Sequence, residues 1–275
     1  MTKKYYKLLL VSSAALGLFG ATLDASAVPT EIYNSNGFES FSDGGLPTQD
    51  GWFDFAAGTG GNSTATVFSD AGLAADGNKA VRIDRAGADG STGSTGFGVP
   101  LPTAPQERYV IIEFDLNATD INANSVFGPG FGIELFTTGN NQVAGFGIDA
   151  GDASFFQFTV DDILFSDEGL VREVYQEWMI TVDLVDEQYT VVVDGNTIGT
   201  TAFFNGAFFD YDFGDRITDA SIVTFATDGS APNAEGVAYI DNYIVTTEVP
   251  EPSSVIAIVV LGGTVFARRR RRCCC

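Results

Sequence analysis

Residues 177–199, EWMITVDLVDEQYTVVVDGNTIG, decide the fold class of this chain. The stretch is rich in Val, Ile, Thr and Tyr, with clusters of Asp, Glu, Gly and Asn between them, which is typical of strands joined by tight turns. We predict strands over 178–184, 189–193 and 197–200. The last two form a hairpin across Asp194, Gly195 and Asn196, because Gly195 supplies the positive φ that a tight turn needs.

The same pattern extends over most of the chain. Further strands are predicted over 79–83, 109–116, 130–136, 143–148, 154–160, 222–226 and 237–245. Only the composition of residues 168–177 is also compatible with a short helix. Neither an internal repeat of roughly 20 to 50 residues nor a linker is present. The chain is therefore predicted to be all-β, with an antiparallel β-sandwich as its one domain.

The first 27 residues have the three-part pattern of a secretory signal peptide. Three lysines within the first seven residues precede an apolar run over 8–21, and the small residues ASA follow at 25–27. We predict export through the Sec translocon and cleavage after Ala27. The alternative, an apolar first helix of the domain, does not account for the basic start and the small-residue end.

The C-terminal end combines three features in a fixed order. Val249, Pro250, Glu251 and Pro252 precede an almost entirely apolar stretch over 255–267, and five arginines follow. At about 1.5 Å per residue, a helix of that stretch spans roughly 20 Å, less than the ~30 Å hydrocarbon core of a bilayer. The arginines would hold this end on the cytoplasmic side.

These three features resemble the PEP-CTERM sorting signal of Gram-negative bacteria, over residues 249–272. The resemblance implies transient anchoring in the inner membrane by a short C-terminal transmembrane helix and removal of that tail by an exosortase. The body would then reach the cell surface or an extracellular exopolysaccharide matrix. An anchor that is never cleaved is the alternative. Cys273–Cys275 depart from the family pattern, and on the reducing cytoplasmic side they are poor candidates for structural disulfides.

Charge and composition exclude several function classes. The 275 residues include 14 Lys and Arg, 36 Asp and Glu and no His, for a net charge of −22. Eight of the basic residues lie in the two end segments, so residues 28–248 have a net charge of −28. This balance argues against nucleic acids and anionic lipids as partners. The absence of His excludes Ser-His-Asp and Cys-His catalysis.

The order of short motifs in residues 28–248 resembles the concanavalin-A-like or carbohydrate-binding-module jelly roll. The motifs are GFES at 37–40, DGW at 50–52, GNKAVRI at 77–83, YVIIEFDL at 109–116, the stretch at 177–199 and AYIDNYIV at 238–245. The resemblance implies two antiparallel sheets packed face to face. It also implies a structural Ca²⁺ held by Glu39, Asp241 and backbone carbonyls, a ligand set that suits this cation. Alternatively, Glu39 is a solvated loop residue and Asp241 a strand-edge acid.

One strand has side chains that could serve catalysis. Period-2 alternation places Glu113, Asp115 and Asn117 on one face. This resembles the three acids of laminarinase-like hydrolases, with Asn117 in place of the third. A retaining hydrolase needs two carboxyl groups about 5 Å apart, and the same positions suit the solvated face of a sandwich. We therefore predict no catalytic residue and no enzyme.

An aromatic loop favours carbohydrate binding instead. Residues 205–215, NGAFFDYDFGD, place aromatic residues among acids and glycines, and we predict that Phe209, Tyr211 and Phe213 stack on sugar rings. Burial of some of these rings in the core is the alternative. Trp52 and Trp178 are predicted core anchors. The sequence thus predicts a non-catalytic surface or matrix protein that binds glycans. A divergent polysaccharide hydrolase and a purely structural surface protein are the alternatives.

Overall fold

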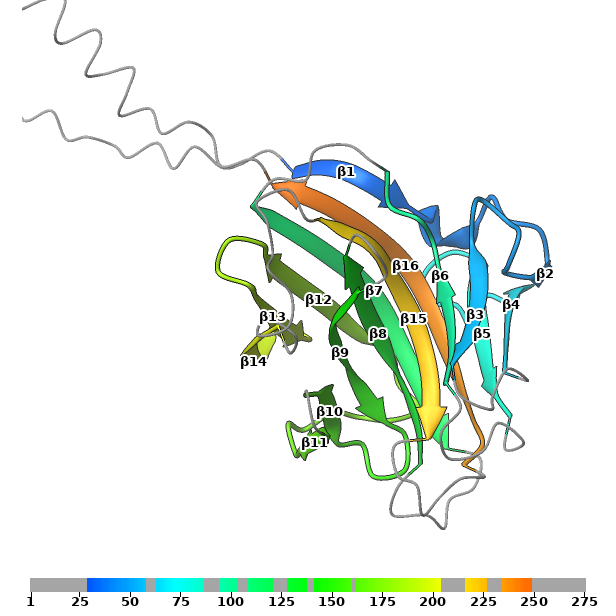
Figure 1. The fold of residues 1–275 in the computed structure, drawn as a ribbon. Coiled ribbons are helices and arrows are strands. Elements are labelled where there is room, and N and C mark those ends of the chain that lie inside the picture. Colours follow the sequence, from blue (N-terminus) through cyan, green and yellow to red (C-terminus); the bar gives the residue numbers. More distant parts are fainter. Residues whose placement is uncertain are drawn as a thin grey trace, which may run out of the picture. The chain divides into compact units, whose positions relative to one another are not determined.

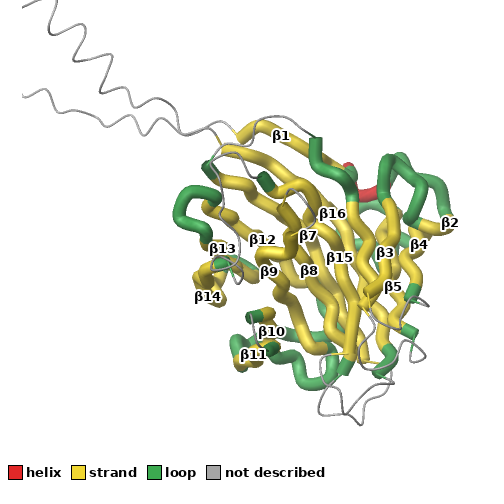
Figure 2. The backbone as a smooth tube through the Cα atoms, in the orientation of Figure 1, coloured by secondary structure: helices red, strands yellow, loops and turns green. Residues whose placement is uncertain are grey.

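In a computed structural model of the chain, antiparallel strands form two stacked sheets (Figure 1). The structure describes residues 29–57, 63–86, 94–102, 108–120, 128–137, 141–159, 162–203, 216–226 and 234–248. These residues belong to one unit, Val28–Pro250. Strands dominate its backbone, with one short helical turn, η1 (Asn36–Phe38), as Figure 2 shows.

Within the described residues, sheet A has nine strands, in the order β14-β13-β12-β7-β16-β5-β4-β2 with β1 also paired to β16. Their bounds are β1 Pro29–Asn34, β2 Gly44–Gly45, β4 Thr64–Ser69, β5 Lys79–Arg85, β7 Tyr109–Asp120, β12 Gln176–Asp183, β13 Gln188–Val193, β14 Asn196–Ala202 and β16 Gly236–Glu248. In the pairing of β1 with β16, Pro29 lies opposite Glu248. The first and last described residues therefore meet at the same end of the sheet.

Sheet B, counted over the same residues, has seven strands in the order β11-β10-β9-β8-β15-β6-β3. Their bounds are β3 Phe53–Ala57, β6 Ser94–Gly98, β8 Pro129–Thr137, β9 Asn141–Asp149, β10 Phe155–Phe158, β11 Ile163–Ser166 and β15 Ile217–Ala226. All pairings in it are antiparallel, as the strand pattern of the sequence predicts.

The predicted hairpin and core anchors are confirmed. Val193 pairs directly with Asn196, and Asp194 and Gly195 have φ of +49° and +76°, which suits a two-residue hairpin turn. Trp52 and Trp178 are 2% and 1% exposed. Trp178 of sheet A stacks on Phe155 of sheet B, with ring centroids 6.5 Å apart, so this ring contact helps to join the sheets.

The short helix that the composition of 168–177 allowed does not form. Residues 167–175 contain bends and irregular backbone, and Gln176 already begins β12. Gly169 and Glu173 both have positive φ, which interrupts right-handed helical geometry. The Gln176 side chain instead accepts a hydrogen bond from the backbone of Val171 at 3.0 Å.

The two end segments lie outside the described residues, and with them Ala27 and the sorting motif at 249–252. Among the residues that are described, no helix has the length and apolar character needed to cross a bilayer. Export and sorting therefore stay predictions.

Candidate functional site

The candidate site is the outer face of sheet B, which points away from sheet A. In β8, alternate residues from Phe131 to Leu135 pack into the core between the sheets. The residues between them, Gly132 and Glu134, therefore lie on the outer face. They are buried as well, whereas a strand with one solvated face alternates between buried and exposed residues. Gly132 and Glu134 are thus shielded from bulk water.

Glycines on this face provide space for aromatic rings. A Cβ on Gly96 of β6 would lie 2.1 Å from the ring of Phe55, and one on Gly145 of β9 would lie 2.1 Å from the ring of Phe158. The rings therefore lie directly on the backbone of the neighbouring strand. Only glycine permits so close an approach.

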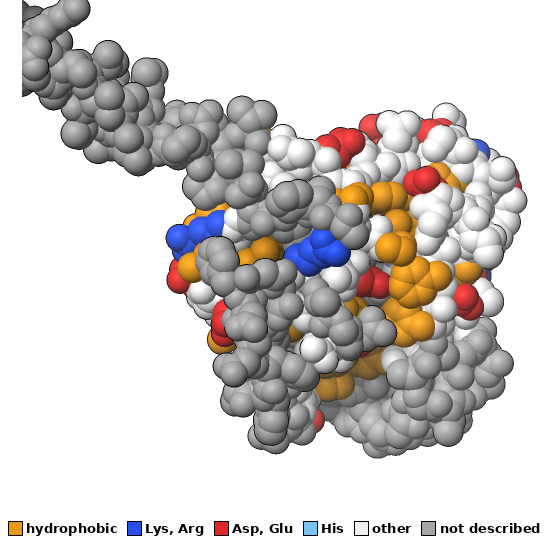
Figure 3. Space-filling model, turned by 45° about the horizontal axis from the view of Figure 1, so that its top comes forward, with side chains coloured by type: hydrophobic (Ala, Val, Ile, Leu, Met, Phe, Trp, Pro, Cys, Tyr) orange, Lys and Arg blue, Asp and Glu red, His pale blue; other side chains and the backbone are white. Residues whose placement is uncertain are grey.

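Three of the outer-face rings form a row that we call the aromatic strip: Phe53, Phe55 and Phe136. Phe55 contacts Phe136 edge-to-face at 5.8 Å and Phe53 at 6.1 Å between ring centroids. Phe53 is 37% exposed, so one end of the strip reaches solvent. On the face of the molecule in Figure 3, hydrophobic side chains gather in patches with acidic side chains beside them.

Two carboxyl groups, which we call the carboxyl pair, lie beside the strip. Glu134 of β8 pairs with Ser221 of β15, and Asp219 pairs with Phe136. Glu134 and Asp219 are thus diagonal neighbours on one face, a relation that places residues roughly 7–8 Å apart. The Ser221 hydroxyl donates a hydrogen bond to Asp219 Oδ1.

Burial changes the protonation of this pair. Burial raises the pKa of Glu134 to about 7. The charge of Asp219 adds to this rise, whereas a hydrogen bond with Gln142 lowers the pKa. Burial also raises the pKa of Asp219 to about 6, although the hydrogen bond from Ser221 lowers it. Near pH 7 Glu134 is therefore partly protonated, and its protonated form donates a hydrogen bond, whereas an ionised carboxylate only accepts them.

The sequence reasoning missed the carboxyl pair and the strip. The available signal was Glu134 inside the strand GFGIELF, on the same face as the glycines, where alternation otherwise predicts solvent. The residues that were predicted to bind glycans, Phe209, Tyr211 and Phe213, lie outside the described residues.

The predicted calcium ligands, Glu39 and Asp241, both hold the loop 75–79. Asp241 Oδ2 accepts hydrogen bonds from the first two backbone N–H groups of this loop, at 3.0 and 3.1 Å. Glu39 Oε1 accepts from the last two, at 2.5 and 2.9 Å. The structure thus brings these two residues, 202 positions apart in sequence, to one loop.

Oxygen atoms converge above Gly37, close to these two carboxylates. A Cβ on Gly37 would lie 3.3 Å from Asn242 Oδ1 and 3.4 Å from Asp241 Oδ1. Burial raises the pKa of Asp241, although its hydrogen bonds with backbone N–H groups lower it. The described residues contain no cluster of three or more His, Cys, Asp or Glu side chains suited to a metal. A Ca²⁺ held here would therefore need amide or backbone oxygens besides the two carboxylates, which are donors that suit a hard cation.

Glu113, Asp115 and Asn117 share the outer face of sheet A, as alternation predicts. Asp115 accepts a hydrogen bond from Asn242 Nδ2 at 2.7 Å. Asn242, with φ of +51°, lies in the β-bulge of β16 between Asp241 and Ile244. Asp115 therefore supports the bulge that positions Asp241.

Comparison with known proteins identifies the fold. No protein-family model and no curated protein matches the chain. Three solved structures are similar: the cellulose-induced protein Cip1, a carbohydrate esterase from the Shiga toxin-encoding bacteriophage phi24B, and an endo-β-1,4-glucuronan lyase from the fungus Trichoderma reesei.

The first is 16% identical, covers 76% of this chain and 94% of its own, and has a TM-score of 0.52. The esterase is 18% identical, with coverages of 80% and 100% and a TM-score of 0.52. The lyase is 12% identical, with coverages of 79% and 96% and a TM-score of 0.51. At these identities the similarity establishes the fold alone, and the predicted jelly-roll body is confirmed.

Proposed function

We propose that this chain is an exported jelly-roll protein that binds a polysaccharide, without cleaving it, at the outer face of sheet B. The observation that carries the proposal is the aromatic strip beside the carboxyl pair. The apolar faces of sugar rings pack on aromatic rings, while a few polar groups nearby bind the hydroxyls and set the orientation. The names of the three similar structures refer to cellulose, to a carbohydrate ester and to a glucuronan, and these names support carbohydrate as the ligand class.

A divergent polysaccharide hydrolase is the second candidate function. The carboxyl pair favours it, because glycoside hydrolysis uses two carboxyl groups, one as acid and the other as base or nucleophile. Glu113 and Asp115 are less suitable as catalytic carboxyl groups. Asp115 accepts a hydrogen bond from Asn242 in the β16 bulge, and both acids lie on sheet A.

Three further features complete the proposal. The signal peptide directs the chain to the Sec translocon, and the segment 249–272 presents it to an exosortase, which releases the body to the cell surface or matrix. Ca²⁺ is a structural cofactor held by Glu39 and Asp241. The strongly acidic body keeps the protein soluble outside the cell.

The decisive experiment compares two phenylalanine variants in affinity electrophoresis against neutral and acidic polysaccharides. Phe55→Ala removes the centre of the strip and should weaken binding about tenfold, since one aromatic contact is worth roughly 0.5–1.5 kcal/mol beyond its burial. Phe68→Ala is the matched control, because Phe68 makes a similar ring contact, with Tyr239 at 5.7 Å, on the outer face of sheet A.

Two outcomes contradict the proposal. If no polysaccharide retards the protein, or if Phe55→Ala and Phe68→Ala lose binding equally, the strip is not the binding site. If reducing sugar is released by the wild type and not by Glu134→Gln, the protein is a hydrolase and the non-catalytic part of the proposal is wrong.

A further inference from the structure

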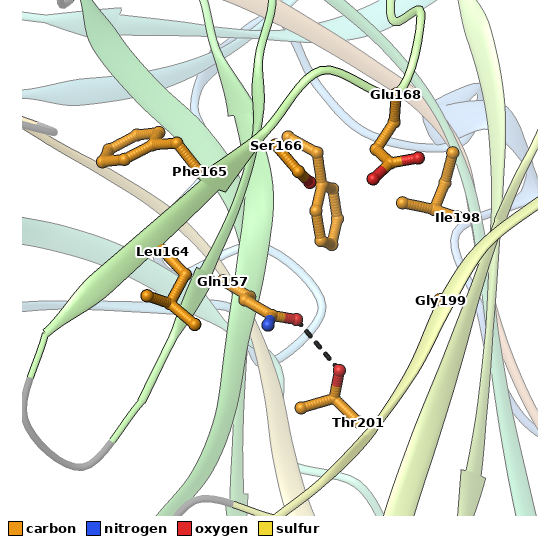
Figure 4. Close-up of a pocket in the computed structure, with 9 residues that line it drawn as sticks. Gln157, Leu164, Phe165, Ser166, Glu168, Ile198, Gly199 and Thr201 are labelled. Atoms are coloured by element: carbon orange, nitrogen blue, oxygen red, sulfur yellow. Dashed lines mark hydrogen bonds between the residues drawn. The ribbon is translucent and has the colours of Figure 1, made fainter.

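A pocket of about 270 Å³ lies at an edge of the sandwich, apart from the aromatic strip. Its walls come from β10 and β11 of sheet B, from Glu168 beyond β11, and from β14 of sheet A (Figure 4). Because β11 and β14 are the terminal strands of their sheets, this edge pocket occupies the place where the two sheets end.

The polar groups of the edge pocket are only partly used by the protein. Thr201 Oγ1 donates a hydrogen bond to Gln157 Oε1 at 2.9 Å, from one sheet to the other. This bond fixes the Gln157 amide and leaves its Nε2 as a donor. Glu168 is exposed, and Figure 4 shows its carboxylate among the side chains that line the pocket.

The apolar wall consists of Phe155, Leu164 and Ile198. Leu164 is 51% exposed, so a ligand in the pocket would cover part of its apolar surface. Phe165, the neighbour of Leu164, points away from the other labelled side chains in Figure 4. It packs against the cluster of Phe156, Val223 and Phe225 on the outer face of sheet B. The β10–β11 hairpin thus has one side toward each of the two sites.

We propose that the edge pocket binds a single uncharged sugar ring, as a carbohydrate subsite separate from the outer face of sheet B. Its 270 Å³ lie below the roughly 300–1,000 Å³ of pockets for drug-sized ligands, so the occupant is one ring rather than a chain segment. The ring packs on the apolar wall, and its hydroxyls exchange hydrogen bonds with Gln157 and Glu168.

Other ligand classes fit the pocket less well. An aliphatic group would cover the Gln157 amide and leave its Nε2 donor without a partner, which is unfavourable. A sugar acid or a phosphate would place a negative charge next to Glu168. A neutral polyol ring avoids both penalties.

Gly199 offers a way to fill the pocket without disturbing the fold. It lines the pocket, and a Cβ there would meet no atom within 4 Å. Its φ is outside the positive range that disfavours other residues, so Gly199→Leu should fold and occupy the ligand volume. Gly45→Leu in β2 is the matched control, because that glycine is equally open and lies at the opposite side of sheet A.

The test is an NMR titration of the purified protein with D-glucose, N-acetyl-D-glucosamine and D-glucuronate at pH 7. We expect saturable shifts at 155–157, 164–168 and 198–201 for at least one neutral sugar, and at least fivefold weaker binding of glucuronate. Gly199→Leu should weaken the neutral sugar at least tenfold and Gly45→Leu should leave it unchanged. Glu168→Gln should reduce the discrimination against glucuronate.

The proposal is overturned if neither neutral sugar produces these shifts, if binding survives Gly199→Leu, or if glucuronate binds the wild type as well as glucose does. The result is independent of the polysaccharide experiment, since Phe55→Ala leaves the edge pocket intact. Loss of polysaccharide binding with retained monosaccharide shifts would contradict the outer-face site alone.

Discussion

Strand β7 of sheet A and strand β8 of sheet B are both central strands, but they differ on their outer faces. In β7, buried and part-exposed residues alternate from Val110 to Thr119. In β8, every residue from Pro129 to Leu135 is buried. The outward positions of β7 are mostly polar, whereas those of β8 include Gly132, which lies directly against the backbone of β9. The outward acids of β7, Glu113 and Asp115, are therefore part-exposed, whereas Glu134 of β8 is buried.

Two buried acids show the electrostatic consequence. Burial also acts to raise the pKa of Asp183 in sheet A, but hydrogen bonds from Arg108 and from two backbone N–H groups hold it below the ordinary value. Arg108 Nη2 lies 2.6 Å from Asp183 Oδ2. For Glu134, burial and the charge of Asp219 outweigh the hydrogen bond with Gln142, so its pKa rises. What decides the direction is the partner of the acid rather than its burial.

The largest expected effect comes from adding one methyl group to the outer face of sheet B. A Cβ on Gly132 would lie 1.9 Å from the backbone oxygen of Phe146. Since neither strand can move without breaking its ladder, Gly132→Ala should lower the free energy of unfolding by about 3 kcal/mol or more. Urea denaturation of the variant and the wild type measures this change in the free energy of unfolding. Gly199→Ala should stay within about 0.5 kcal/mol of the wild type, and equal losses in the two variants would contradict the comparison.

The next effect is a pH dependence of opposite sign at Glu134 and at Asp183. Glu134 binds its proton more tightly in the folded state, so its contribution to stability is present below about pH 4.5 and is lost as the pH rises to about 7. Asp183, with a lowered pKa, contributes above its ordinary value and loses that contribution as the pH falls.

Unfolding free energies measured from pH 3 to pH 8 test this difference. Glu134→Gln should be more stable than the wild type at pH 8 by roughly 2–3 kcal/mol, with little difference at pH 4.5. Asp183→Asn should instead reduce the loss of unfolding free energy that the wild type shows as the pH falls toward 3. A Glu134→Gln profile parallel to that of the wild type would show that Glu134 does not hold a proton at neutral pH.

The smallest effect concerns metal removal, which should act on sheet A alone. A site at tenfold excess of Ca²⁺ over its Kd adds about 1.4 kcal/mol, so EDTA should lower Tm by about 3–6 °C for a domain of this size. Asp241→Ala should abolish the response to EDTA. Hydrogen exchange should rise at loop 75–79 and not in β8, and an unchanged Tm would contradict the calcium proposal.

Much of the fold follows from local sequence patterns. The strand that contains YVIIEFDL alternates clearly because one side faces the core and the other faces water. The hairpin at Asp194 and Gly195 needs only its own turn chemistry. Short edge strands such as β2, with two glycines, and β11 have too few residues for any periodicity, and they depend on neighbours that pair with them.

The site was harder to predict for a different reason. Glu39 and Asp241 belong to motifs whose order could be compared with a family, and the structure places them at one loop. The carboxyl pair arises only from the register of β8 against β15, which sets Glu134 diagonally to Asp219. The glycines of the outer face carry no pattern of their own, because their role is to leave room for rings from other strands.

The pairing of β1 with β16 has a mechanical consequence. Since Pro29 lies opposite Glu248, a body attached through its C-terminal segment would be held at the corner where its first described residue also lies. A pull on that attachment runs along β16, which is bonded to β7 on one side and to β1 and β5 on the other. A force along β16 loads many interstrand hydrogen bonds at the same time. An attachment at this strand therefore resists force better than one at an edge strand, whose hydrogen bonds break one after another.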